Sequence, residues 1–236
     1  RQRQMCIRDS VYADFITNSL FGLTLTIYVF RKVGLHYHKE KAKDLIQFGT
    51  PFILTNIGAF ILTFSDRYFL KYFWDLKEVG IYSLGYKIGF ILSFLVTRSI
   101  NGIWEAQRFE VIKQPDRMNV INKTLFLYTF ILVTVGLGLS IYSRDLFRIM
   151  SEPDYWDAYK IVPIVVLAYI FQGLTGFFNL GIYYKSKTIY VTYATVIALV
   201  TIVLLSFLLI PKYGGHGAAV ATVVAFFLRL VMVYYY

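Results

Sequence analysis

Cysteine, histidine and charged residues are all scarce in this sequence, and each shortage excludes something. The 236 residues include one cysteine, Cys6, which excludes a disulfide framework and a cysteine-rich metal site. His36 and His38 lack further ligands at a useful spacing, so we expect no metal. Only 16% of the residues are charged and 57% are hydrophobic, whereas a soluble domain of this length needs far more polar surface. The composition therefore argues against a soluble domain.

Long apolar runs are what the sequence has instead. Each is close to the length that crosses a hydrocarbon layer of about 30 Å at about 1.5 Å per residue. The pattern predicts an all-α, polytopic helical membrane protein with seven transmembrane spans. These predicted spans are residues 11–30, 45–65, 79–101, 121–142, 158–182, 188–210 and 216–236.

The first ten residues differ from everything that follows. The segment RQRQMCIRDS is polar and has no apolar core, so it is not a signal peptide. The string MCIRDS resembles translated sequencing-adaptor sequence, and we expect residues 1–10 to be a foreign segment. The chain also ends inside an apolar run, and we expect it to be a fragment of a longer protein.

Basic residues alternate between the loops and predict the orientation in the membrane. The loops after the first, third and fifth spans hold twelve Lys and Arg residues, whereas the opposite loops hold seven, offset by seven acids. By the positive-inside rule, the loop at 31–44 is cytoplasmic and the loop at 143–157 lies outside. This distribution also accounts for the net charge of +10, so we expect no nucleic-acid partner.

Lys87 is the charge that topology does not explain. It lies eight residues, or roughly 12 Å, inside the third span. Intramembrane charges are costly and usually face a bundle interior or a water-filled cavity. At about 100° per residue, a polar stripe about 60° wide runs along this span and includes Ser83, Lys87, Phe94, Arg98 and Asn101. The alternative is a lysine that snorkels to the headgroups.

Two other spans carry polar stripes. In the second span, Gly49, Asn56, Thr63 and Arg67 share a face, and in the fifth the stripe is Tyr169, Gln172, Gly176, Asn179 and Tyr183. For each stripe alone, helix packing through amide side chains is an equal alternative. Three stripes together favour a shared hydrophilic cavity. The predicted cavity residues are Lys87, Arg98, Asn56, Arg67, Gln172 and Asn179.

Two motifs, SDRYFL with VGIYSLGYKIG and then PKYGGHGAAVAT, resemble those of a known family. They are similar to the bacterial polysaccharide flippases, the O-antigen and capsule repeat-unit exporters of the multidrug/oligosaccharidyl-lipid/polysaccharide exporter superfamily. One departure is that Trp104 is followed by Glu105 and Ala106 where relatives often have Trp-x-Pro. The matching positions are Asp66, Arg67, Tyr68, Gly80, Ile81, Tyr82 and Ser83, and then Pro211, Tyr213, Gly214, Gly217, Ala218, Ala219, Ala221 and Thr222.

The resemblance implies a transporter with twelve to fourteen helices in two six-helix lobes. Residues 11–30 would then be the last helix of the first lobe, 31–44 the cytoplasmic loop between the lobes, and 45–236 the second lobe. The location implied is the bacterial cytoplasmic (inner) membrane, crossed many times. No cofactor or metal is implied.

The function that the resemblance implies is the flipping of lipid-linked polysaccharide repeat units by alternating access, without enzymatic chemistry. The partners would be a polyprenyl-pyrophosphate-linked oligosaccharide, the lipid bilayer and other polysaccharide-assembly membrane proteins. Lys87 and Arg98 could attract the pyrophosphate. The amides of Asn56, Gln172 and Asn179 could bind sugar hydroxyls.

Other functions remain open from the residues. A cation-coupled multidrug antiporter of the same superfamily would favour a buried acid, and the second to seventh spans have none deeper than Asp66. A peptidoglycan-precursor flippase is a second alternative. A membrane-embedded glycan polymerase or acyltransferase is more distant, because it would need catalytic carboxylates or a histidine in large outside loops.

Overall fold

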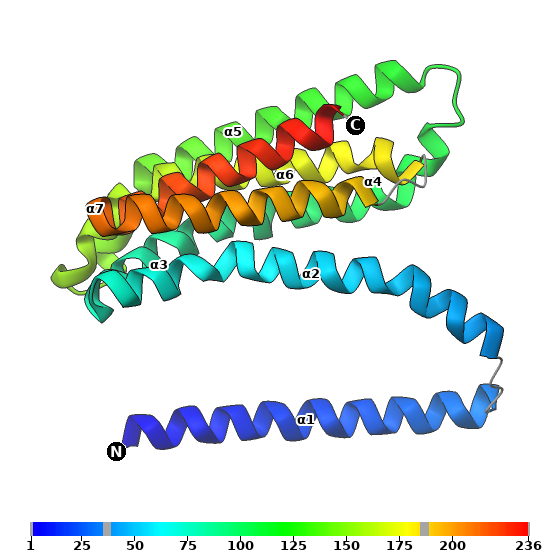
Figure 1. Cartoon of the computed structure of the whole chain (residues 1–236), viewed down its shortest axis with the longest axis horizontal. Helices are drawn as coiled ribbons and strands as arrows, with labels where there is room; N and C mark the ends of the chain where they lie inside the picture. Colours follow the sequence, from blue (N-terminus) through cyan, green and yellow to red (C-terminus); the bar gives the residue numbers. More distant parts are fainter. Residues whose placement is uncertain (1, 35–38, 185–188, 236) are drawn as a thin grey trace. The chain divides into compact units, whose positions relative to one another are not determined.

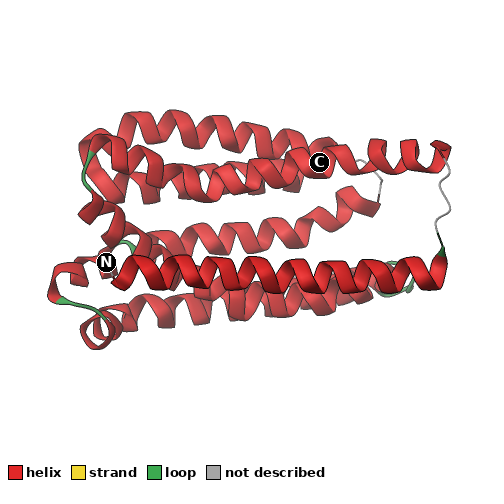
Figure 2. Ribbon diagram, turned by 90° about the horizontal axis from the view of Figure 1, so that it is seen from below, coloured by secondary structure: helices red, strands yellow, loops and turns green. Residues whose placement is uncertain are grey.

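The structure is a computed structural model that describes residues 2–34, 39–184 and 189–235. The structure therefore does not describe His36, His38, Lys185 and Lys187. Within the described ranges, some side chains are also left out of the description, namely those at 2–11, 47–48, 51–52, 54–55, 106, 108–109, 180–181 and 183–184. The described chain consists of helices joined by short loops, with no strand among the described residues (Figure 2). The predicted all-α class is therefore confirmed.

Seven α-helices follow one another along the described chain (Figure 1). Two shorter segments interrupt them: the π turn η1, Ser93–Thr97, and the 3-10 helix η2, Pro153–Lys160. The α-helices are α1 Gln2–Val33, α2 Lys39–Phe73, α3 Leu76–Leu92, α4 Arg98–Val111, α5 Arg117–Met150, α6 Val162–Tyr184 and α7 Ile189–Tyr235.

The chain divides into two units, Arg1–Gly49 and Thr50–Tyr236. The first holds α1 and the start of α2. In it, α1 continues without a break from the segment at 2–10 into the first predicted span. The second unit holds the rest of α2 and α3 to α7, and all the contacts described below lie within it.

Helix α7 is a hairpin of two arms rather than one rod. Its backbone leaves the helical region at Gly214, where φ is 53° and ψ is −133°. Glycine adopts such a positive φ without steric cost. Figure 1 shows the chain turning back there, so that the two arms lie side by side. They correspond to the sixth and seventh predicted spans. From the sequence, Pro211 and the glycines at 214 and 215 predict this turn, and the small residues from Gly217 to Ala221 predict a smooth surface for close packing. The break at Gly214 confirms the turn.

Small residues allow the two arms to approach closely. A Cβ atom added at Gly217 would lie 2.5 Å from the carbonyl oxygen of Leu209 on the other arm. Ala218, Ala219 and Ala221 are fully buried beside it. The smooth packing surface predicted for this segment is therefore confirmed.

Helices α3, α5 and α6 enclose the main core of the second unit, and Leu92, Leu132 and Val165 are fully buried there. A second cluster joins α2, α6 and the two arms of α7 around Leu62, Ile202 and Phe226. Many large apolar side chains point outward instead, among them Phe130 and Ile141 of α5. Outward apolar surface is what helices in lipid present.

Five helices of the described residues are long and apolar enough to cross a membrane. The chain is therefore a multi-pass membrane protein, as predicted. The second predicted span, 45–65, includes positions whose side chains lie outside the description, and the total of seven spans stays a prediction. The five are Tyr12–Val33, Leu76–Glu105, Arg117–Met150, Val162–Asn179 and Ile189–Tyr235, the last of which contains both arms of the hairpin.

Candidate functional site

Asp66, in the last third of α2, has no exposed surface. Its Oδ2 atom accepts a hydrogen bond from the Tyr82 hydroxyl of α3, which is also fully buried. Its Oδ1 atom accepts from the backbone N–H of Arg67 at 2.8 Å. A buried carboxylate needs such partners, because an unpaired one is far more costly to bury.

Arg67 is held in place by three kinds of contact. Its Nη1 atom lies 3.2 Å from Oδ1 of Asp66 and donates to the carbonyl oxygen of Thr63 at 2.8 Å. Its guanidinium carbon lies 4.6 Å from the ring centroid of Tyr86. The side chain is 22% exposed. The charge of Arg67 is therefore largely committed to its own helix and to α3.

The local sequence explains how α3 and α6 approach each other beside this site. Tyr82 and Tyr86 are four residues apart and share a face of α3. Gly85 and Gly89 alternate with them, and a Cβ atom at Gly89 would lie only 2.5 Å from Cγ1 of Val165 on α6. Glycine at these positions lets the tyrosines reach the interior between the helices.

The segments that contain or adjoin the two motifs contact each other. Glu78 accepts a hydrogen bond from the backbone N–H of Gly215 at 2.9 Å, and Trp74 donates to the carbonyl oxygen of Ile210 at 2.8 Å. Gly80 packs against Tyr155 of η2. Tyr68 takes no part in this junction, since 73% of its surface is exposed. The turn between α2 and α3 is thus attached to the turn of the α7 hairpin.

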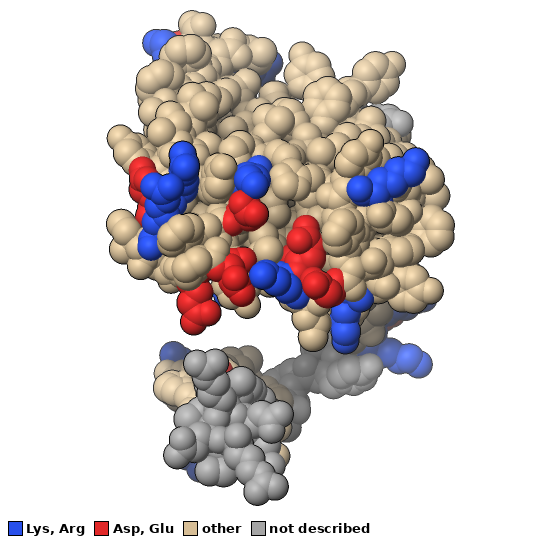
Figure 3. Space-filling view, turned by 90° about the vertical axis from the view of Figure 1, so that its left-hand side faces the viewer, with Lys and Arg blue, Asp and Glu red and all other residues tan. Residues whose placement is uncertain are grey.

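Acidic and basic side chains occur together at this end of the unit, as Figure 3 shows. Asp75 accepts from the N–H of Glu78 at 2.8 Å and caps the start of α3. Lys77 lies 3.4 Å from Asp154, and both are exposed. The mixture agrees with the acid-offset loops that the charge count assigns to the outside.

Lys87 and Arg98 are exposed on the rod formed by α3, η1 and α4. Phe94 lies between them, also exposed, and its ring centroid is 5.8 Å from the guanidinium carbon of Arg98. We refer to Lys87, Phe94 and Arg98 as the cationic row. It includes three of the five residues of the predicted stripe.

Asn101, which follows the π turn, faces the interior instead. Such a turn takes about one residue more than an α turn, so it shifts the positions that follow around the helix. Asn101 is half-buried, and its Nδ2 atom lies 3.2 Å from where a Cβ atom of Gly176 would be. The α6 stripe therefore faces Thr97 and Asn101, and not the cationic row.

The three amide residues predicted for the cavity lie in different surroundings. Asn56 is exposed on α2. Gln172 is half-buried on α6, and Asn179, on the same helix, is 9% exposed. The side-chain oxygens of both α6 residues are buried and have no hydrogen-bond partner among the described residues. Their roles in substrate binding, like that of Asn56, stay predictions.

The sequence analysis missed Tyr86, Thr97 and Tyr128 as polar residues of the interior. Tyr86 could have been found, because it lies four residues after a motif tyrosine and between two glycines. Thr97 and Tyr128 carried no such signal. A lone threonine or tyrosine in an apolar run is ordinary, and only the packing brings these two hydroxyls to the same place beside Gly173.

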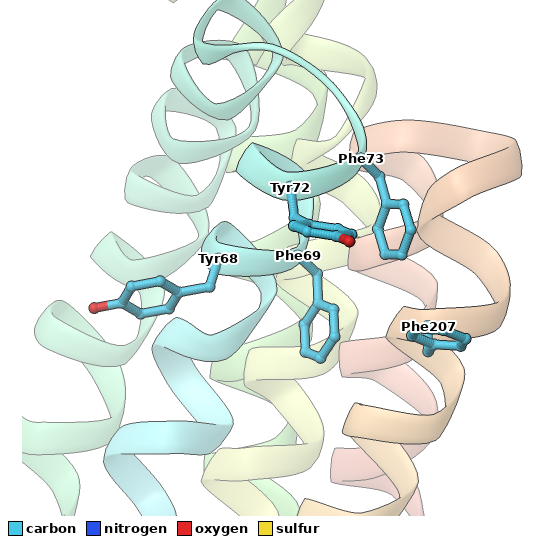
Figure 4. A pocket seen from close by; sticks show the side chains of 5 residues that line it. All are labelled: Tyr68, Phe69, Tyr72, Phe73 and Phe207. Atoms are coloured by element: carbon cyan, nitrogen blue, oxygen red, sulfur yellow. The ribbon is translucent and has the colours of Figure 1, made fainter.

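An aromatic pocket of about 330 Å³ lies between the end of α2 and the first arm of α7 (Figure 4). The rings of Phe73 and Phe207 meet edge to face at a centroid distance of 5.7 Å. In Figure 4 the Tyr68 ring extends away from the other four. The pocket residues are Tyr68, Phe69, Tyr72, Phe73 and Phe207.

Comparison with known proteins agrees with the motifs. Residues 10–103 match the family described as polysaccharide biosynthesis protein. A relative in Haloferax volcanii, the "Probable low-salt glycan biosynthesis flippase Agl15", is 20% identical over 225 residues. That alignment covers 94% of this chain and 47% of the relative, so the chain spans about half the relative's length. No solved structure matches the chain. The chain is therefore similar to flippases of polysaccharide biosynthesis, in agreement with the resemblance of its two motifs.

Proposed function

We propose that the chain is the second lobe, with the last helix of the first, of a transporter that moves lipid-linked oligosaccharide repeat units across a membrane. The family supports this proposal, because its description and the relative's name both refer to glycan biosynthesis. Flipping makes and breaks no covalent bond, so the function proposed is not enzymatic. The proposed location is the bacterial cytoplasmic membrane, although the relative is archaeal.

The observation that carries the proposal is the cationic row. Leu76–Glu105 is apolar enough to cross a membrane, yet it exposes Lys87 and Arg98. Exposed cations within a membrane span are costly and need an anion or water. A polyprenyl pyrophosphate supplies the anion, with an isoprenoid tail that can stay in lipid.

The two cations suit the pyrophosphate in different ways. Arg98 can form two parallel hydrogen bonds to phosphate oxygens, whereas Lys87 is a mobile point charge. Arg67 and the amides of Asn56, Gln172 and Asn179 remain proposed contacts for the sugar portion. Alternating access would carry the head group across as the two lobes rock about the site. Other polysaccharide-assembly membrane proteins are the proposed partners.

Substitution of Lys87 tests the proposal. In the full-length protein, we expect Lys87→Ala to weaken substrate binding on the order of tenfold to a hundredfold, because one charge-assisted contact is lost. Lys87→Arg should retain part of the activity, since the charge persists while its geometry changes. The measurement is surface glycan in cells that lack their own flippase, with protein abundance measured in parallel.

Lys123→Ala is the matched control. Lys123 is also an exposed lysine, but it lies at the start of α5, in the predicted basic loop region. We expect this variant to export glycan normally. Normal surface glycan from Lys87→Ala at normal abundance would contradict the proposal.

A second candidate function rests on Asp66. A cation-coupled antiporter would favour a buried acid, and Asp66 has no exposed surface. Efflux of a cationic dye from cells that express the full-length protein discriminates between the two. Dye efflux without glycan export would favour the antiporter. A peptidoglycan-precursor flippase would use the same pyrophosphate chemistry, so only the sugar of the exported lipid separates it from the first proposal.

A further inference from the structure

Buried polar side chains form two neighbouring groups along α6 in the interior of the second unit, one around Asp66 and one beside Gly173. The series takes in Asp66 and three tyrosines, on α3 and α6, and then a pair of hydroxyls beside the π turn. We call it the polar line. Its main members are Asp66, Tyr82, Tyr86, Tyr169, Thr97 and Tyr128.

The first half of the polar line joins α2, α3 and α6. Tyr82 donates to Asp66, and the rings of Tyr82 and Tyr86 have centroids 5.6 Å apart. Tyr86 and Tyr169 meet edge to face at 5.5 Å, and each is 3% exposed. Their hydroxyls are near neighbours, but neither makes a hydrogen bond of good geometry with a described group.

The second half lies one turn further along α6, at Gly173. A Cβ atom there would lie 2.7 Å from the Tyr128 hydroxyl and 3.1 Å from the Thr97 hydroxyl. Both oxygens are buried, and neither makes a hydrogen bond of good geometry with a described group. The next turns of α6 bring Asn101, beside Gly176, and then the buried Oδ1 atom of Asn179. Three to four residues of helix rise by about 4.5–6 Å, which one water molecule can bridge.

Such groups require partners. A buried hydroxyl or amide without a hydrogen bond is destabilising, and ordered water usually supplies the missing bond. Hydroxyls donate and accept at once, so a series of hydroxyls and waters can pass a proton along. Glycine at 173 and 176 lets the polar groups of the neighbouring helices come close to the α6 backbone.

Asp66 is the carboxyl group of this series, and burial raises its pKa above the ordinary value. Its side chain has no exposed surface, so it cannot exchange a proton with bulk water directly. The groups that face it are Arg67 on α2, Tyr82 and Tyr86 on α3, and Tyr169 on α6, with Thr222 of α7 beside Tyr82. If Asp66 is protonated, Arg67 keeps its contacts with the Thr63 carbonyl and the Tyr86 ring.

We propose that the polar line holds ordered water and conducts protons between the Asn179 end of α6 and the carboxyl group of Asp66. A proton that enters from bulk water at the Asn179 end displaces one proton at each water and hydroxyl in turn. The Tyr82 hydroxyl gives its own proton to Oδ2 of Asp66 and takes one from the group behind it. The tyrosines, the threonine and the waters are thus restored, and Asp66 alone gains a proton.

The experiment follows the carboxyl C=O band of Asp66 by infrared spectroscopy of the protein in lipid vesicles. We expect a band that grows as the pH is lowered and that is missing from Asp66→Asn. On transfer to D2O, the band should shift quickly in the wild-type protein. Tyr128→Phe and Thr97→Val should each slow this shift by about tenfold, because the waters lose a partner. The midpoint of the titration should not move, since neither residue touches Asp66.

Tyr142→Phe is the control, because it removes a hydroxyl from the same helix as Tyr128 at a position that is 70% exposed. It should exchange at the wild-type rate. An Asp66 band that never appears in folded protein would overturn the proposal, and so would equally fast exchange in Thr97→Val. If Tyr128→Phe does not fold, Thr97→Val alone decides, since valine matches threonine in shape. The infrared experiment uses no glycan. A negative result therefore contradicts the proton proposal alone and leaves the transport proposal untouched.

Discussion

Two regions of the second unit treat charge in opposite ways. Around the first motif, Asp66 and Arg67 are joined to each other and to α3, and the carboxylate is fully buried. In the cationic row, Lys87 and Arg98 point outward from a helix that is otherwise apolar. Asp66 and Arg67 are therefore engaged in holding helices together, while Lys87 and Arg98 remain accessible to a ligand.

The contacts between the motifs lead to the same conclusion. Glu78 and Trp74, near the first motif, bond to Gly215 and Ile210, near the second. Two segments separated by more than a hundred residues thus meet in the fold. The first motif therefore lies at a helix junction.

The largest effect that tests this contrast is expected from Asp66→Ala. The substitution leaves the buried Tyr82 hydroxyl and Arg67 without their partner, and breaking a buried ion pair costs about 3–5 kcal/mol. Asp154→Ala is the control, because the Lys77–Asp154 pair is exposed and such pairs contribute about 0–1 kcal/mol. The measurement is the free energy of unfolding in detergent. Equal losses in the two variants would contradict a structural role for the motif acid.

Two glycines, Gly217 in the α7 hairpin and Gly102 in α4, test how tightly the helices are packed. Gly217→Ala places a methyl group 2.5 Å from a backbone carbonyl, and overpacking of this kind costs about 1–3 kcal/mol. Gly102, in α4, has nothing within 4 Å of its Cβ position, and Gly→Ala in an open helix stabilises by roughly 0.4–1 kcal/mol. Unfolding midpoints should therefore move in opposite directions. A shift in the same direction would show that the hairpin arms are not in tight contact.

Trp74→Phe removes the bond between α2 and the α7 hairpin. We expect the free energy of unfolding to fall by about 1 kcal/mol, which is the usual net contribution of one hydrogen bond. Trp156→Phe is the control, because its indole N–H bonds only to Ser151, five residues away, at 3.2 Å. Thermal unfolding should separate the two variants. A larger loss from Trp156→Phe would indicate that the junction between the motifs contributes little.

The smallest effect on stability is expected from Lys87→Ala. Lys87 is exposed, and surface substitutions usually change the free energy of unfolding by less than about 0.5 kcal/mol. Glycan export should fall in the same variant, as proposed above. If the substitution lowers the free energy of unfolding by more than about 1 kcal/mol, Lys87 is a packing residue and the difference between the two regions disappears.

Prediction from the sequence succeeded where a local pattern reports local structure. Pro211, Gly214 and the small residues after them predicted the hairpin, and apolar runs predicted the helical membrane class. It was incomplete for the third span, because the helical wheel assumed an uninterrupted α-helix. The π turn at Ser93–Thr97 divides that stripe between an outward row and the inward-facing Asn101.

Local sequence was sufficient for the membrane class, the helical class and the hairpin, because lipid demands apolar runs and a reversal demands glycine. The resemblance to flippases was equally visible in the motifs. Which polar residues are paired and which are exposed was decided only in three dimensions. Asp66 and Tyr82 lie sixteen residues apart on different helices, and Thr97 and Tyr128 meet only across Gly173. Pairing depends on which helix faces are adjacent, and no single span encodes its neighbours.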